Sequence, residues 1–183
     1  MQCNVIPTVV NEKAALRAAC RSAQMRVDHG MPYRCRLVFL PMWFATYRCE
    51  IRRFLLPART GLMGAGEDAF TGFVSLAAGV PKTELCEMPP ETTLPSRFDW
   101  PSVSEPIQRQ VVEYFVHKFR RVPDAKLEQF SLIYRPTWAC LLGFGSGHIV
   151  RCIDAHSGDP LYYLDEVAEE ITPLVCFDSC GLN

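Results

Sequence analysis

Residues 130–138 read FSLIYRPTW and residues 154–158 read DAHSG, and together they hold the strongest pattern in this chain. An earlier counterpart reads RLVFLPMW at residues 36–43 and DAFTG at residues 68–72. Each copy has an apolar run, a Pro-x-Trp signature, a second strand-like run and then Asp-Ala-x-(Ser/Thr)-Gly. Because a missed repeat misassigns a whole fold, we take this repeat as the guide to the architecture.

The chain before and within the first copy predicts a helix followed by strands. Asn11 is a suitable N-cap for a helix over residues 12–27. Residues 33–40 are rich in β-branched and aromatic side chains and predict a strand. Pro41 cannot donate a ladder hydrogen bond, so we expect a bulge, a bend or an edge position there. From Trp43 onward the alternation predicts a second strand.

The segments after this strand carry turn and linker signals. Residues 58–66 contain three glycines and predict a loop. Residues 73–79 predict a short helix or turn built from small side chains. Residues 80–100 contain four prolines and predict an extended, partly ordered linker.

The second copy repeats the same order of elements. Ser102 and Glu105 match a capping box, so a helix is expected to start near Ser102 or Ser104. Its apolar residues recur every four positions and form an amphipathic stripe, namely Ile107, Val111, Phe115 and Phe119. Residues 131–135 predict a strand, residues 144–147 a hairpin turn, residues 148–153 a return strand and residues 164–171 a short helix.

We therefore predict an α+β fold made of two repeated α-β-β-β units, with antiparallel sheets packed against helices. The first unit would span residues 1–79 and the second residues 101–183, joined by the Pro-rich linker over residues 80–100. The nine additional residues of the first copy fall in its glycine-rich segment, where an insertion costs little.

Bulk composition narrows the function classes. The chain has 183 residues, 49% of them hydrophobic and 21% charged, which is typical of a packed globular protein. A net charge of −1 gives no global field for nucleic acid, and no apolar run is long enough for a transmembrane segment. The nine cysteines are scattered and odd in number, which favours free thiols over a disulfide framework. Without a signal-like N-terminus, the expected location is cytoplasmic.

The motif at residues 154–158 carries a resemblance. A helix and a three-stranded antiparallel sheet ending in Asp-Ala-x-(Ser/Thr)-Gly is similar to the PepSY-type module, and the similarity covers about 45 residues in each half. The resemblance implies a small module that binds or inhibits another protein and has no catalytic role. It also implies an extracytoplasmic setting, which the N-terminal sequence does not support.

The repeated motifs supply the candidate binding residues, which are Trp43, Trp138, Asp68 and Asp154. Each has a structural alternative. An aspartate in such a turn accepts backbone N–H bonds, and a strand tryptophan is more often a core anchor than a stacking platform. The same four residues are therefore expected either to hold the fold or to line a binding surface.

The leading functional prediction is a non-enzymatic binding or protein-interaction module built from a tandem repeat. One alternative is a hydrolase-like enzyme with a site between the two repeats, and another is a metal-binding regulator that uses Cys176 and Cys180. No catalytic residue, metal ligand set or cofactor is assigned. The expected partner is a protein or a small ligand, with no nucleic acid and no membrane span, and a homodimer is left open.

Overall fold

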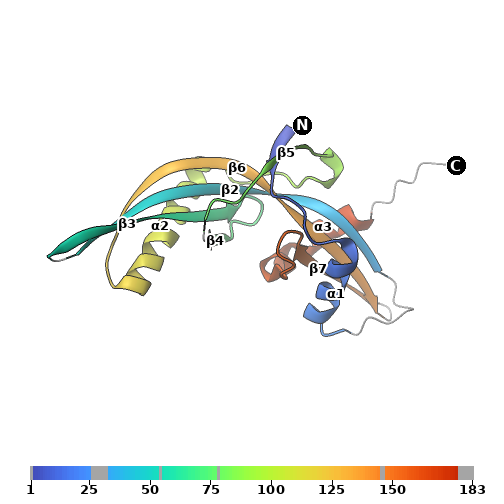
Figure 1. The fold of residues 1–183 in the computed structure, drawn as a ribbon. Helices are drawn as coiled ribbons and strands as arrows, with labels where there is room; N and C mark the ends of the chain where they lie inside the picture. Colours follow the sequence, from blue (N-terminus) through green and yellow to red (C-terminus); the bar gives the residue numbers. More distant parts are fainter. Residues whose placement is uncertain (1, 26–32, 54, 78, 145–146, 177–183) are drawn as a thin grey trace. The chain divides into compact units, whose positions relative to one another are not determined.

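The computed structural model describes residues 2–25, 33–53, 55–77, 79–144 and 147–176. The fold is α+β: within these residues there are three α-helices and one mainly antiparallel set of seven strands. Their order across the sheet is β4-β3-β2-β6-β1-β5, and β7 pairs with β6 (Figure 1). No helix of the described chain is long and apolar enough to cross a bilayer.

The chain forms two compact units, and each unit combines segments that are distant in sequence. Unit 1 contains residues 1–40, 84–94 and 134–183, and unit 2 contains residues 41–83 and 95–133. The predicted division into residues 1–79 and 101–183 therefore does not describe compact units. As a statement about repeats along the chain, it stays a prediction.

Two long strands belong to both units. Strand β2 (Tyr33–Arg53) begins in unit 1 and enters unit 2 at residue 41. Strand β6 (Asp124–Phe144) begins in unit 2 and enters unit 1 at residue 134. The other elements of unit 1 are β1 (Gln2–Val5), α1 (Glu12–Ser22), β5 (Glu84–Glu87), η1 (Pro90–Thr92), β7 (Gly147–Asp154), η2 (Tyr162–Val167) and α3 (Ala168–Cys176). Those of unit 2 are β3 (Leu56–Asp68), β4 (Val74–Ala77) and α2 (Trp100–Phe119).

Helix α1 packs against the strands of unit 1 through small side chains. Asn11 caps the helix by accepting a 2.9 Å hydrogen bond from the backbone N–H of Ala14, which confirms the predicted N-cap. The helix ends at Ser22, earlier than predicted. Its buried face meets the strands in one core cluster: Ala15, Leu16, Ala18, Ala19 and Cys20 from α1, with Cys140, Leu142 and Ile153.

Helix α2 forms the core of unit 2 with β2 and β3, which it accompanies in Figure 1. The predicted stripe is confirmed for Ile107, Val111 and Phe115, which are buried. The predicted start is wrong: the helix begins at Trp100. The side chain of Asp99 accepts the 3.2 Å bond from the Ser102 N–H, so the carboxylate caps the helix in place of the Ser102 hydroxyl.

The glycine-rich segment is a strand, so the predicted loop over residues 58–66 is wrong. It is part of β3, which pairs continuously with β2 from Met42↔Asp68 to Ile51↔Arg59. A Cβ at Gly64 would lie 2.7 Å from the Phe44 ring. A Cβ at Gly66 would lie 3.0 Å from Met42 Sδ. These glycines make room for large neighbours on β2, and pairing overrides their weak strand propensity.

Two further expectations need correction. Residues 74–77 form strand β4 on the edge of β3, where a helix or turn was predicted. The predicted linker contains β5, which pairs with β1 from Gln2↔Glu87 to Val5↔Glu84. Pro41 and Pro136 lie within continuous strands, and the pairing of β2 with β3 begins one residue after Pro41, so the bulge, bend or edge position expected there stays a prediction. Each keeps the extended backbone and uses its carbonyl as an acceptor, from Ala69 N at 2.8 Å and from Ala155 N at 3.0 Å.

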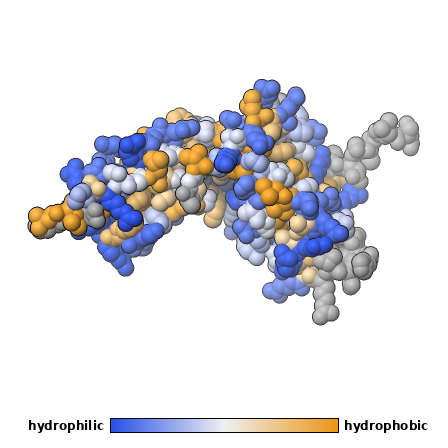
Figure 2. All heavy atoms as spheres, viewed as in Figure 1, coloured by the Kyte–Doolittle hydropathy of each residue, from blue (hydrophilic) through white to orange (hydrophobic). Residues whose placement is uncertain are grey.

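The start of β3 and the residue before it are apolar and open to solvent. Leu55 is 87% exposed and Leu56 is 59% exposed. Orange atoms in Figure 2 mark this end of the hairpin. The predicted hairpin turn of the second copy includes residues 145 and 146, which lie outside the described residues, although β6 and β7 pair up to Phe144↔Gly147.

Candidate functional site

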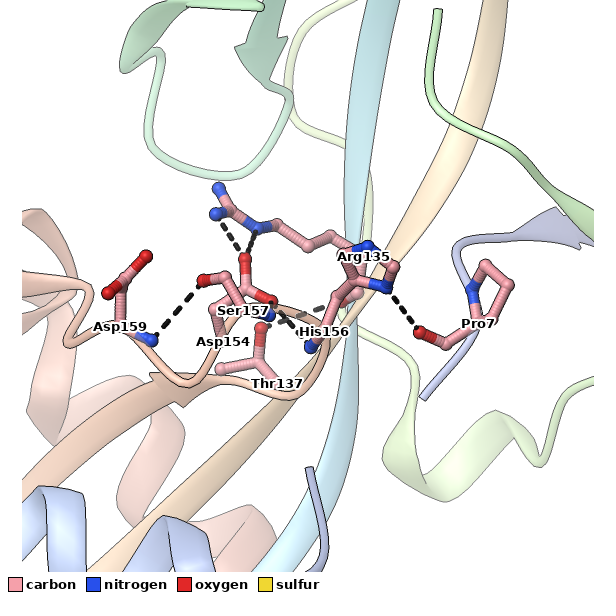
Figure 3. A network of polar contacts seen from close by, with 7 residues as sticks. All are labelled: Pro7, Arg135, Thr137, Asp154, His156, Ser157 and Asp159. Carbon is pink, nitrogen blue, oxygen red and sulfur yellow. Dashed lines mark hydrogen bonds and ion pairs between the residues drawn. The ribbon is translucent and has the colours of Figure 1, made fainter. Parts of the chain in front are cut away.

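In unit 1, Asp154 organises the turn that follows β7 (Figure 3). Its Oδ1 accepts backbone N–H bonds from His156 at 2.6 Å and from Ser157 at 3.0 Å. The Asp154 carbonyl accepts a further bond from Gly158 N at 2.9 Å, and Gly158 has a φ of +84°. A left-handed φ of this size favours glycine, which explains the last position of the motif.

The second carboxylate oxygen of Asp154 binds Arg135, which projects from β6. Arg135 Nε donates to Asp154 Oδ2 at 2.5 Å, and Nη2 also contacts this oxygen. The Asp154 side chain is 5% exposed, so its charge is almost fully removed from water and needs this partner. His156 Nδ1 lies 2.9 Å from the Pro7 carbonyl, so the ring carries its proton on Nδ1 to donate this bond.

In unit 2, Asp68 makes the same turn after β3. Its Oδ1 accepts from Phe70 N at 2.9 Å and from Thr71 N at 3.0 Å. Gly72 N donates to the Asp68 carbonyl at 2.8 Å, and Gly72 has a φ of +80°. Both aspartates thus use one carboxylate oxygen for two backbone N–H groups of their own turn.

The two tryptophans also make matching contacts. Trp43 Nε1 donates to the Phe98 carbonyl at 2.9 Å, and Trp138 Nε1 donates to the Val10 carbonyl at 2.7 Å. Each acceptor immediately precedes a helix N-cap, Asp99 or Asn11. Each indole therefore ties a strand of its unit to the start of a helix, and both rings are only partly buried.

In each unit, the turn and the tryptophan bind the same segment, which is the pair of residues just before the helix N-cap. The Ala69 carbonyl accepts bonds from Arg97 N at 2.7 Å and Phe98 N at 3.2 Å. The Ala155 carbonyl accepts bonds from Val9 N at 2.9 Å and Val10 N at 2.8 Å. The structure thus places Trp43 with the Asp68 turn and Trp138 with the Asp154 turn. It shows structural contacts for all four candidates.

Glu67 is a buried carboxyl that the sequence analysis missed. It pairs across the strands with Trp43, whereas Ile153 pairs with Trp138. Glu67 is 4% exposed, and its Oε2 has no hydrogen-bond partner among the described residues. Burial, assisted by the neighbouring Asp68, raises the pKa of Glu67 from 4.5 to about 7. The residue before the Asp-Ala motif is Glu67 in the first copy and Ile153 in the second, and this difference is a sequence signal that could have identified Glu67.

The raised pKa of Glu67 predicts a pH-dependent stability. The unfolded chain releases this proton at lower pH than the folded chain, so the contribution is complete below pH 4.5 and is lost as the pH rises through 7. The loss is on the order of 3 kcal/mol in the free energy of unfolding. Urea unfolding between pH 4.5 and 8 should show this slope in the parent protein and a flatter profile in Glu67→Gln. Glu113→Gln, at an exposed site on α2, should keep the parent slope.

An aromatic cluster extends from Trp43 to the surface of unit 2. The rings of Trp100 and Phe130 are stacked, with centroids 4.2 Å apart and planes at 10°. Trp43 lies 5.9 Å from Trp100 and 6.3 Å from Phe130. Phe130 is 46% exposed, so this cluster, defined as Trp43, Trp100 and Phe130, presents an aromatic surface.

Unit 1 contains a close thiol pair. Cys35 Sγ lies 2.9 Å from Cys140 Sγ. Cys35 is partly exposed, whereas Cys140 is fully buried. The hydrogen bond with Cys35, followed by burial, raises the pKa of the Cys140 thiol, which keeps it protonated at neutral pH. All cysteines among the described residues are free thiols in this structure.

We expect hydrogen peroxide to join Cys35 and Cys140 in a disulfide, because their sulfur atoms are already close. Peroxide would oxidise the more accessible Cys35 to a sulfenic acid with release of water, and Cys140 would then displace a second water to form the disulfide. Peptide mass mapping should find the linked pair, and Cys140→Ser should abolish it. Cys20→Ser, which changes a buried neighbour in the same core, should leave it intact. Without oxidant, all nine thiols should titrate after denaturation.

No group of three or more His, Cys, Asp or Glu side chains in the described chain is arranged to hold a metal ion. Cys176 is exposed at the end of α3, and Cys180 lies outside the described residues, so the metal role suggested for this pair stays a prediction. Comparison with protein-family models, with curated proteins and with solved structures finds no match.

Proposed function

We propose that this chain is a non-enzymatic protein-binding module built by internal duplication of a PepSY-like α-β-β-β unit. The matching turns, with equivalent bonds at Asp68 and Asp154, support the duplication. So do the equivalent indole bonds of Trp43 and Trp138, each to the residue before a helix N-cap. In this proposal each unit takes its helix and first strand segment from one copy, and its tryptophan, return strand and turn from the other.

The observation that carries the binding role is the half-exposed Phe130, stacked on Trp100 along an edge of unit 2. Strand β6 pairs with β7 from Thr137 onward and with β1 at Tyr134. Over residues 124–133, β2 is therefore the only neighbour of β6 within the described chain. An edge strand presents backbone donors and acceptors in the register that an added strand requires.

The partner proposed for this edge is an extended segment of another protein with an apolar or aromatic side chain. Its backbone would pair with residues 124–133 of β6, and its side chain would pack on Phe130 beside Trp100. Leu127, at 44% exposure, adds apolar surface on the same strand. Aromatic surfaces of this kind supply much of the binding energy in protein interfaces. Trp43 supports the stack from within the unit and is the predicted site residue that belongs to this surface.

A displayed library of short random peptides, selected against the folded chain, tests this function. We expect enrichment of extended sequences with an aromatic or large apolar residue. Their affinity should fall at least about tenfold with Phe130→Ala, the change that removes one anchor ring. Leu62→Ala is the matched control, because Leu62 is also an exposed apolar residue of unit 2, at 62% exposure, and lies on β3.

Backbone pairing is tested separately from side-chain contact. Only every second N–H group of a paired peptide faces the edge strand. N-methylation of those positions should abolish binding, whereas N-methylation of the intervening positions should leave binding unchanged. Failure to enrich any peptide, or equal binding by the Phe130→Ala variant, would overturn the proposal. If the free chain is a dimer by light scattering and Phe130→Ala makes it a monomer, the edge binds a second copy.

A further inference from the structure

A cavity of about 190 Å3 lies in unit 2 between the last turns of α2, the end of β2 and the beginning of β3. Its floor is apolar: Ile51 and Phe115 are buried and Met63 is partly buried. Gly61 forms part of the wall, and a Cβ built there would meet no atom within 4 Å, so the strand leaves open space on this side.

Two cations line this cavity without acidic partners. The Arg59 guanidinium carbon lies 5.4 Å from the Phe119 ring centroid. Lys118 Nζ lies 5.0 Å from the Tyr114 ring centroid and 2.6 Å from its hydroxyl oxygen. Neither cation has a carboxylate within 4.0 Å among the described residues. Elsewhere in unit 2, Arg48 and Arg109 do form such pairs.

The rest of the described cavity lining supplies no carboxylate to offset this positive charge. No Asp or Glu is among the described lining residues. Burial raises the pKa of the Cys49 thiol to about 11, so this lining residue is neutral at pH 7. The partial negative charge at the end of α2 accounts for Lys118 in the last turn of the helix. It does not account for Arg59, which comes from β3.

We propose that this cavity binds a small carboxylate that carries an apolar chain or ring. The apolar part would lie on Ile51, Met63 and Phe115, and the carboxylate would lie between Arg59 and Lys118. Ligand pockets for drug-sized molecules are usually about 300 Å3 or larger, so this cavity suits a smaller compound. The site is separate from the β6 edge and does not depend on the protein-binding proposal.

Titration with hexanoate, followed by isothermal calorimetry or ligand-detected NMR, tests the site. Hexanoate should bind with a dissociation constant on the order of 1 mM, the range open to so few atoms. Hexanol, with the same chain and no charge, should bind at least about fivefold more weakly, because it lacks the charge-assisted bonds. Arg59→Gln and Lys118→Gln should each weaken hexanoate by a similar factor and leave hexanol unchanged.

The controls separate a built site from general surface charge. Arg109→Gln removes a cation from the same helix outside the cavity and should leave hexanoate binding unchanged. Met63→Trp should fill the cavity and block both ligands, and its thermal unfolding midpoint reports whether the fold is kept. Equal affinity for hexanoate and hexanol overturns the carboxylate assignment. Absence of binding at about 10 mM hexanoate, or equal weakening by Arg109→Gln, overturns the site.

Discussion

The Asp154→Ala variant is expected to lose about 2–4 kcal/mol in the free energy of unfolding. The substitution removes the carboxylate that binds Arg135 and leaves the N–H groups of His156 and Ser157 without their acceptor. Both effects arise at a side chain that is only 5% exposed, so water does not replace the lost bonds. Equilibrium urea unfolding of the purified variant measures the loss.

Two further variants divide this effect between its sources. Asp154→Asn keeps an oxygen for the two turn N–H groups and removes the charge opposite Arg135, so its loss should fall between zero and that of Asp154→Ala. Asp159→Ala changes an exposed residue of the same turn and should stay within about 0.5 kcal/mol of the parent. A loss below about 1 kcal/mol for Asp154→Ala would contradict a structural role for this carboxylate.

Trp43→Ala and Trp138→Ala should each cost about 3 to 5 kcal/mol, because each leaves a gap between a strand and a helix. Trp43 packs against the α2 core cluster and Trp138 against the α1 core cluster. Chemical denaturation followed by far-UV circular dichroism gives both values.

Phenylalanine variants isolate the indole hydrogen bonds. Trp43→Phe and Trp138→Phe keep most of the ring but cannot donate to Phe98 O or Val10 O. We expect losses of about 1 to 2 kcal/mol from the unmade bond and the smaller ring. If either alanine variant lost less than about 1 kcal/mol, that ring would be a surface group and its binding role would gain support.

Local signals in the sequence predicted the elements whose evidence lies within one segment. Asn11 caps α1, and the stripe of Ile107, Val111 and Phe115 is the buried face of α2. The α+β class follows from these helices and the alternating strands. The start of α2 was predicted wrongly because Ser102 and Glu105 match a capping box, while Asp99 is the stronger acceptor three residues before Ser102.

Other features depend on which strands pair, and local sequence signals do not predict this pairing. Glycines 61, 64 and 66 predict a loop in isolation, yet β3 pairs with β2 throughout this segment. The side chains of Phe44 and Met42 occupy the space that Gly64 and Gly66 leave. Nor could the sequence reveal which half supplies which strand to a unit, since β2 and β6 change units within continuous extended segments.

The binding role of the four candidate residues stays a prediction. The two repeated motifs pointed to Trp43, Trp138, Asp68 and Asp154, and in the structure each of these side chains has a defined hydrogen-bond partner. The stack of Phe130 on Trp100 joins a strand to a helix start 30 residues earlier in the chain, and no local pattern predicts that contact. The burial of Glu67 likewise depends on packing from several elements.

The passage of β2 and β6 through both units has a consequence for cooperativity. The core around α1 needs Cys140, Leu142 and Ile153 from the second half of the chain, and the core around α2 needs residues 45–51 from the first half. Neither half alone can complete a core, so melting should be a single all-or-none transition. Residues 1–79 and 80–183, expressed as separate fragments, should each stay unfolded and regain structure on mixing, as complementary fragments do.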